Sequence, residues 1–467
     1  MNLLNRRAIL TTVAAALAAA PAFAAEPASL SVSKIKDLNV RIYGFVETDV
    51  IADTTGGFTE EQGNNLVPMR TGATPISGVN GGVQNFTGAH HRTEMSVRNS
   101  RIGFDLTMPK TEGGLAPEAV IELDALGNNA PNTAPGAAAG TQNERDFFNN
   151  PAIRVRHAYV NLTYNDQWNA KIGQYWSLLG WQPYYFPGEA IVQPGPGQLY
   201  RRFAQMRVTN TCTKLDGWTV ETAADIAKPA EMNSGTPESH AGLRVASTKW
   251  KAASISGAGT SMVGLSGAVS GALIPIQTNG IGNPVGKAYA VDFAIPLIPS
   301  SDGKDRSNNL VWMGEFMSGS GVGGLEYSGL TLGVPGVTAA ATGAGTAIDS
   351  GIAGVNNSGE AELVKYRAFR THVQYSLPGG KWALSGGYAQ VEGRNLSRFG
   401  NGSAAAIYAT QAALAPKIQF GYVSAFYDAA SWLRFAAEAN ETRDTYNDAG
   451  NRRATNNRYQ FSTFFVF

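Results

Sequence analysis

Hydrophobic and polar residues alternate along most of this chain with a period of two. Between residues 39 and 51, Ile42, Val46 and Val50 fall on one face of an extended segment. Glu47 and Asp49 fall on the other face. Successive side chains of a β-strand point to opposite sides, whereas a helix would repeat every 3.6 residues. The pattern therefore predicts an all-β chain whose strands are apolar on one side only.

The alternation recurs in about sixteen runs. They are expected to start near residues 39, 95, 117, 152, 168, 201, 217, 239, 252, 286, 307, 362, 381, 417, 432 and 457. Three further groups of apolar residues are predicted to share a face: Ile102, Phe104, Leu106 and Met108; Ile153, Val155 and Tyr159; and Ile418, Phe420, Tyr422 and Phe426. The last run places Tyr459, Phe461, Phe465 and Phe467 together. Such a series is typical of a large antiparallel sheet.

The connections between the runs alternate in length. Short ones, such as residues 165–167 and 378–380, consist of turn residues. Long ones separate them, at residues 52–94, 125–151, 177–200, 319–361, 392–416 and 443–456. Short periplasmic turns and long external loops are the pattern of transmembrane β-barrels. We therefore predict a transmembrane antiparallel β-barrel of about 16 strands.

Aromatic residues gather at the ends of the runs. Tyr164 and Trp168 flank one short turn, and Tyr375 and Trp382 flank another. Amphipathic rings prefer the membrane–water boundary, where barrels carry aromatic girdles. The alternative is that these rings are ordinary core residues.

The first residues predict export. Arg6 and Arg7 precede an alanine-rich apolar stretch, and Ala22-Phe23-Ala24 matches a cleavage site. We predict a signal peptide at residues 1–24, a short periplasmic segment at 25–38 and the barrel at 39–467, with a retained signal anchor as the alternative. No later segment has the 18 or so consecutive apolar residues of a spanning helix. The predicted location is the Gram-negative outer membrane.

Charge and cysteine content narrow the classes of function. Without Arg6 and Arg7 the chain has 35 basic residues against 36 acidic ones, which argues against a nucleic-acid partner. Cys212 is the single cysteine, so no intramolecular disulfide can form. His157 and His372 lie inside strand runs, and no serine of a nucleophile elbow stands beside either. We predict no catalytic residues, no metal, no cofactor and no enzyme activity.

Arginines are the candidate functional residues. Arg101, Arg154, Arg156, Arg207 and Arg370 lie on polar faces and are expected to point into the lumen. Fixed cations in a water-filled channel favour anions, and guanidinium binds carboxylate through two hydrogen bonds. This predicts a preference for small anionic organic acids such as dicarboxylates. The alternative is that the arginines pair with acidic residues: Glu47, Asp49, Asp105, Glu122, Asp124 and Glu315.

The loop of residues 177–200 differs from the other long loops. It contains Trp181, Tyr184, Tyr185, Phe186 and Glu189. An exposed external loop would not normally carry so many aromatic rings. We predict that this third long loop folds into the lumen and narrows the channel. Packing against a neighbouring subunit is the alternative.

Several short stretches resemble the DcaP-like family of trimeric outer-membrane porins. They are Ile42-Tyr43-Gly44-Phe45-Val46, Asn99-Ser100-Arg101-Ile102-Gly103-Phe104, Arg156-His157-Ala158-Tyr159-Val160, Ile172-Gly173-Gln174-Tyr175-Trp176-Ser177, and residues 201–207 with Gln205. The resemblance implies a sixteen-stranded monomer, a homotrimer and a channel for small organic acids. It also implies a constriction that includes Arg101, Arg154, Arg156, Arg201 and Arg207. The coiled-coil extension of some family members has no counterpart here, because only about fifteen residues separate Ala24 from the first strand.

The final residue, Phe467, ends an aromatic alternation that resembles the assembly signal of outer-membrane barrels. The predicted partners are outer-membrane lipid, two further copies of the chain, small anionic solutes and the barrel-assembly machinery. The predicted function is passive diffusion of small polar solutes. Two alternatives stay open at this point, namely a general non-selective porin and a plugged structural or adhesive barrel.

Overall fold

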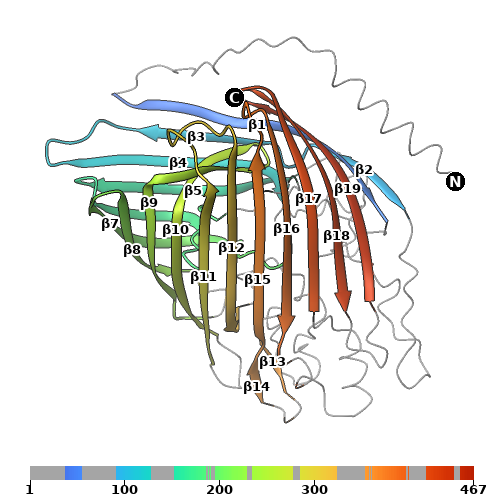
Figure 1. Ribbon diagram of the computed structural model, residues 1–467. Helices are drawn as coiled ribbons and strands as arrows, with labels where there is room; N and C mark the ends of the chain where they lie inside the picture. The colour runs from blue at the N-terminus through green and yellow to red at the C-terminus, as the bar shows by residue number, and fades with distance from the viewer. Residues whose placement is uncertain are drawn as a thin grey trace, which may run out of the picture.

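The computed structural model describes residues 37–54, 91–127, 152–185, 188, 190, 195–228, 234–276, 284–322, 353–356, 358, 360–395, 398, 417–445 and 453–467. Most of the strands curve into one large sheet (Figure 1), while two short strands at residues 353–355 and 361–363 form a separate pair. The strands are β1 (Asn39–Asp53), β2 (Arg92–Ser96), β3 (Arg101–Thr107), β4 (Leu115–Gly127), β5 (Ala152–Tyr164), β6 (Trp168–Trp176), β7 (Arg202–Leu215), β8 (Trp218–Ala227), β9 (Glu238–Ser256), β10 (Gly259–Pro275), β11 (Val285–Ile298), β12 (Asn309–Ser320), β13 (Ala353–Val355), β14 (Ala361–Leu363), β15 (Lys365–Ser376), β16 (Trp382–Gly393), β17 (Lys417–Ala430), β18 (Leu433–Thr445) and β19 (Arg453–Val466).

The sheet closes on itself. Each strand pairs antiparallel with its neighbour, and β1 pairs with β19 from Phe45↔Val466 to Asp53↔Arg458. The sheet contains 17 strands, but β2 and β3 both pair with β1, along Asp49–Asp53 and Asn39–Phe45 respectively. They therefore occupy one position in the wall, and the barrel has 16 positions. The predicted all-β antiparallel barrel is confirmed.

Most connections alternate in length as predicted, although residues 299–308 between β11 and β12 form a connection as long as residues 276–284 before β11. Turns as short as residues 165–167 and 216–217 lie at one end of the barrel, and the wider gaps between strands lie at the other. One predicted start is wrong, because β9 continues to Ser256 and the next strand begins only at Gly259. Residue 252 instead lies within a β9–β10 hairpin that bends into the barrel.

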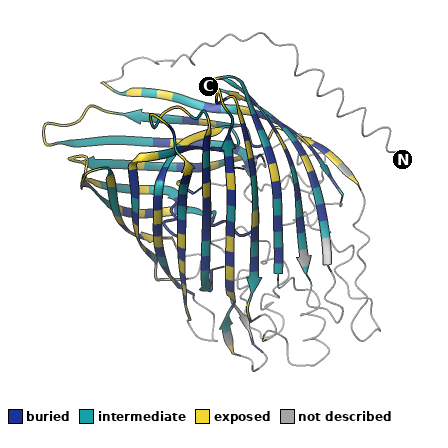
Figure 2. Ribbon diagram, viewed as in Figure 1, coloured by how far each residue is buried: buried dark blue, intermediate teal, exposed yellow. Residues whose placement is uncertain are grey.

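The two faces of each strand have opposite environments (Figure 2). On β1, Val46 is 52% exposed on the outside, whereas Glu47 is fully buried on the inside. The first strand and β3 confirm the predicted faces: Ile102 is exposed outside, and Arg101 lies on the other face. In a membrane barrel the apolar outer face contacts lipid, because every backbone polar group is already paired within the closed sheet.

Tyr159 was predicted to share a face with Ile153 and Val155, and this prediction is wrong. The pairing of β4 with β5 shifts register between Glu122↔His157 and Leu123↔Val155. Arg156 is the extra residue of this β-bulge, which reverses the alternation beyond it. Tyr159 consequently faces inward, where its ring lies 5.0 Å from that of Tyr175.

The large apolar residues of β17 that were predicted to share a face point into the barrel rather than toward lipid. Ile418, Phe420, Tyr422 and Phe426 do share a face, as predicted, but all four are buried inside the barrel. The outward positions include Val423, which is 63% exposed. Large apolar residues can face the lumen here because other segments of the chain cover them.

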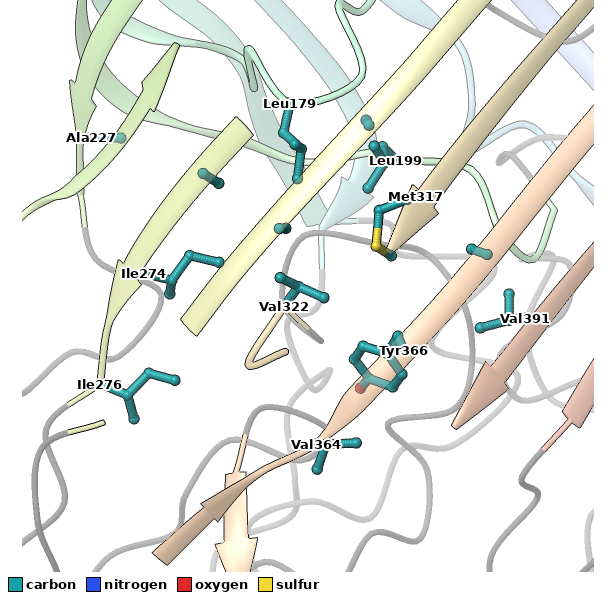
Figure 3. Packing of buried hydrophobic residues seen from close by; sticks show 14 of the residues in the cluster. Leu179, Leu199, Ala227, Ile274, Ile276, Met317, Val322, Val364, Tyr366 and Val391 are labelled. Carbon is teal, nitrogen blue, oxygen red and sulfur yellow. The ribbon is translucent and has the colours of Figure 1, made fainter. Parts of the chain in front are cut away.

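Two segments fill part of the lumen. The described residues of the inward loop (177–185, 188, 190 and 195–200) follow β6, and the inward hairpin (residues 251–264) is formed by the adjoining ends of β9 and β10. Leu179 and Leu199 of the inward loop pack with Met317 of β12 and Val391 of β16 in one buried cluster (Figure 3). The hydrophobic core of this barrel therefore lies between its wall and the inserted segments.

Candidate functional site: the lumen wall and the inward loop

The inward loop lies inside the barrel, as predicted from its aromatic residues. Trp181 and Tyr185 are each 4% exposed and pack with Ala268 of β10 and Met313 of β12. Tyr184 is 39% exposed, and the guanidinium of Arg244 lies 3.6 Å from its ring centre. Of the other predicted loop residues, Phe186 and Glu189 lie outside the described residues.

Buried charges on the wall bind the backbone of the inward loop. The Leu199 N–H donates to Glu315 of β12 at 2.8 Å, and the Ala190 N–H donates to Glu438 of β18 at 2.8 Å. Arg370 of β15 donates to the carbonyl oxygen of Gly195 at 2.9 Å. Each bond is made in a buried, low-dielectric setting, where an unmade bond is costly. These three contacts hold the loop against the wall formed by β10–β12 and β15–β19, which we call the loop-covered wall.

Glycine allows the closest approach between the loop and this wall. A side chain at Gly195 would place its Cβ 2.7 Å from the ring of Phe420, so only glycine fits. Gly195 therefore marks the place where the loop meets β17. Arg370 lies 5.6 Å from the centre of the same Phe420 ring.

The opposite wall, formed by β3–β8, is the charged wall. On it Arg154 binds Asp124 through two bonds, of 3.0 and 2.7 Å. Arg156 donates to Glu122 at 2.7 Å and to Asp124 at 3.0 Å. Arg101 lies 3.6 Å from Glu122. Glu122 and Asp124 are two residues apart on β4, as are Arg154 and Arg156 on β5, so the pairing of these strands brings all four together.

Arg202 joins this group without a carboxylate of its own among the described ion pairs. Its guanidinium lies 4.8 Å from the ring centre of Trp176 and 5.5 Å from that of Tyr200. We call Arg101, Arg154, Arg156 and Arg202 the arginine cluster. Within it, four guanidinium groups face two carboxylates, which leaves two positive charges in excess.

The excess positive charge changes the pKa of Tyr200, at the end of the inward loop. Burial raises the pKa of the Tyr200 hydroxyl, but the positive charges of Arg156, Arg202, Arg101 and Arg154 outweigh burial and lower the pKa to about 8. Arg156 reaches the hydroxyl at 3.5 Å. The local potential at this point of the lumen is therefore positive.

The remaining predicted arginines lie apart from the cluster. Arg201 binds Glu238 at 3.1 Å, and Arg207 binds Asp225 at 3.2 Å. Arg370 lies on the loop-covered wall, bonded to the loop. The structure thus supports the alternative that many arginines pair with acids, and five of the six predicted residues do so. Of the acids named for that alternative, Glu122 and Asp124 are the partners here.

Sequence reasoning missed three lumen residues. Arg202 was passed over beside Arg201. Tyr200 was not singled out from the loop. Lys171 lies 3.9 and 4.2 Å from the ring centres of Tyr159 and Tyr175. A signal for the cluster was present, because two acids spaced by two on one run matched two arginines spaced by two on the next. Because a long connection separates those two runs, the register between them could not be predicted from the sequence.

No described helix is long and apolar enough to cross a membrane. No group of three or more His, Cys, Asp or Glu side chains among these residues could hold a metal ion.

Comparison with known proteins supports the architecture. No family model and no curated protein sequence matches this chain. Among solved structures it is similar to the outer membrane channel DcaP of Acinetobacter baumannii, with a TM-score of 0.61 and 13% identity over 94% of this chain and 100% of that one. The anion-selective porin from Comamonas acidovorans matches with a TM-score of 0.48 and 9% identity, over 92% of this chain and 100% of that one. The chain has the fold of the Gram-negative outer-membrane porins.

Proposed function

We propose that this barrel is a water-filled channel that prefers small organic anions, dicarboxylates among them. The observation that supports this most directly is the arginine cluster, with its two excess positive charges and the lowered pKa of Tyr200. Fixed positive charge in a pore with low-dielectric walls raises the local concentration of anions and excludes cations.

The geometry of the cluster suits carboxylates. The side chains of Arg101 and Arg154 keep 24% and 26% of their surface exposed, so their charge can be reached from the lumen. A passing carboxylate can accept two parallel hydrogen bonds from one guanidinium. Glu122 and Asp124 already interact with part of each guanidinium group. A solute carboxylate should therefore bind weakly, which lets the solute leave again.

The test is a reversal potential in planar bilayers under a salt gradient. Anion preference shifts the potential toward the anion equilibrium value. A shift of the opposite sign would reject the preference, and no conductance from folded protein would reject the channel. The ion pairs of Arg201 and Arg207 favour a second candidate, a general porin, which predicts a reversal potential near zero.

The same preference should extend to substrates. Liposome swelling with succinate should be faster than with an uncharged solute of similar size, because both carboxylates are attracted to the cluster. Equal rates for the two solutes would support the general porin instead.

We further propose that the chain works as a homotrimer after removal of residues 1–24. OmpT of Vibrio cholerae, which this chain also resembles in shape, is described in a trimer form. Mass measurement of the detergent-solubilised protein and sequencing of its N-terminus test both statements. A monomeric mass would reject the first, and an intact Met1 would reject the second.

Phe467 is proposed to act in assembly by the barrel-assembly machinery. Its backbone exchanges two hydrogen bonds of 3.0 Å with Gly44, at the seam where β19 meets β1. Phe467→Ala should lower the yield of folded barrel in cells while leaving refolding in detergent intact. An equal loss in detergent would assign Phe467 to seam stability alone.

A further inference from the structure

The β9–β10 hairpin departs from the barrel wall (Figure 1). Up to Ala246↔Ser266 the two strands belong to the wall, and beyond a register shift they pair again from Lys251↔Gly264 to Ser256↔Gly259. Residues 247–250 on β9 oppose only residue 265 on β10, so the pairing is interrupted by a large bulge of four residues against one. Bulges bend strands, and this one directs the inward hairpin toward the barrel interior.

The far half of the hairpin is buried among lumen-facing residues. Ala252, Ala253 and Ile255 are at most 2% exposed. Ile255 packs with Phe426 of β17, Phe464 of β19 and Ala190 of the inward loop. A short turn of a membrane barrel is normally exposed to water, so this burial requires that the hairpin lie inside the mouth of the barrel.

Polar side chains from the loop-covered wall hold the hairpin backbone. Gln374 of β15 accepts from the Ile255 N–H at 2.6 Å and donates to the Ile255 carbonyl at 2.8 Å. Asn309 of β12 accepts from the Ala253 N–H at 3.0 Å. Each of these groups would be buried without a partner if the hairpin were elsewhere.

Arg434 of β18 binds the tip. It donates to the carbonyl oxygens of Gly257 and Gly259 at 2.7 and 2.9 Å and to the Thr260 hydroxyl at 2.7 Å. Asp428 holds the same guanidinium in place at 2.5 and 3.0 Å. Arg434 alone therefore donates hydrogen bonds to two carbonyl oxygens of the hairpin turn. This turn lies next to β18, although it connects β9 and β10.

We propose that the inward hairpin is a size filter at the short-turn end of the lumen. This inference rests on the channel function proposed above. The hairpin and the inward loop touch at Ile255 and Ala190 and together cover the wall of β12 and β15–β19. The path left for solutes runs beside the charged wall. The hairpin sets its width, and Arg434 keeps the hairpin from swinging out.

The main test shortens the hairpin. Because Lys251 and Gly264 are register partners, residues 252–263 can be replaced by Asn-Gly, a two-residue turn that closes antiparallel strands. Single-channel conductance should rise roughly twofold, since current follows the open cross-section, and larger polyethylene glycols should enter. As a matched control, removal of residues 110–113 from the exposed β3–β4 turn should change neither property. Unchanged conductance and polymer cut-off in the shortened, folded barrel would overturn the filter.

A second measurement needs no conductance and so separates this inference from the channel function. In a Cys212→Ser background, Ser254→Cys should react with a maleimide at least roughly tenfold more slowly than Ser301→Cys, because Ser254 is 7% exposed and Ser301 lies on an exposed turn. Adding Arg434→Ala should speed the labelling of Ser254→Cys. Equal labelling of the two cysteines would place the hairpin outside the lumen and reject the filter, whatever the channel conducts.

Discussion

The charged wall and the loop-covered wall of the lumen use charge in different ways. On the charged wall, Arg154 and Arg156 bind the carboxylates of Glu122 and Asp124. On the loop-covered wall, Glu315, Glu438 and Arg370 bind the backbone of the inward loop instead. The Arg154 side chain keeps 26% of its surface exposed to the lumen, whereas charges that satisfy an inserted backbone are sealed. The first wall can therefore select solutes, and the second can only shape the space.

The apolar residues follow the same division. The loop-covered wall carries Phe420, Tyr422 and Phe426 inward, beneath the loop and the hairpin. The inward rings of the charged wall, such as Tyr159 and Tyr175, are partnered by Lys171 and are not covered by an inserted segment in the described contacts. An aqueous lumen needs a polar lining only where water reaches it.

The largest expected effect comes from the charged wall. Replacing Arg154 and Arg156 together by glutamine removes the two excess positive charges of the cluster. Anion preference should vanish, and the reversal potential should fall to near zero. Lys249→Gln, which removes an exposed positive charge of β9, should leave selectivity unchanged. Retained preference in the double variant would mean that another part of the lumen selects.

A stability effect should come next, from the loop-covered wall. Phe420→Ala opens a cavity where Gly195 packs against the ring, and such truncations cost about 3–5 kcal/mol. Tyr159→Ala on the charged wall should cost less, because Tyr159 is only partly buried. Urea unfolding in lipid vesicles measures both. Equal losses would show that the two walls are packed alike.

Loosening one anchor should have a smaller effect. Glu438→Ala leaves the Ala190 N–H without its acceptor, a local cost of about 1–3 kcal/mol. The inward loop should then fluctuate and make single-channel currents noisier. Glu441→Ala on the same strand is the control, since Glu441 pairs with Arg443 rather than with the loop. Quiet currents in Glu438→Ala would indicate that the other anchors suffice.

The smallest effect should be a pH dependence. With a pKa of about 8, the Tyr200 hydroxyl is neutral below that pH and carries a negative charge above it. Ionisation cancels one of the two excess positive charges, so anion preference should decrease as the pH rises through about 8. Tyr200→Phe should abolish this transition. A transition that persists in Tyr200→Phe would assign it to another group.

Much of the fold could be predicted because a barrel strand has a strong period-two signal. The alternation of Ile42, Val46 and Val50 against Glu47 and Asp49 places β1 and its faces without further information. The aromatic content of residues 177–200 likewise predicted a loop inside the lumen. Both predictions follow from burial, which depends on residue type and spacing.

Other features depend on contacts that alternation does not encode. The extra residue at Arg156 reverses the face of Tyr159, and a one-residue bulge leaves no mark in composition. The inward faces of Phe420 and Phe426 are decided by the loop and hairpin that cover them. Arg154 and Arg156 could be placed in the lumen from sequence, but their carboxylate partners depend on the register between β4 and β5.

The sequence by itself indicated a barrel of about sixteen strands with one apolar outer face and arginines on the inside, because side-chain direction in a strand is local. Only the tertiary structure decided which arginines are paired, which wall is sealed and where the β9–β10 hairpin goes. Those features depend on residues far apart in the chain, such as Arg434 and Gly257, that meet only when the barrel closes.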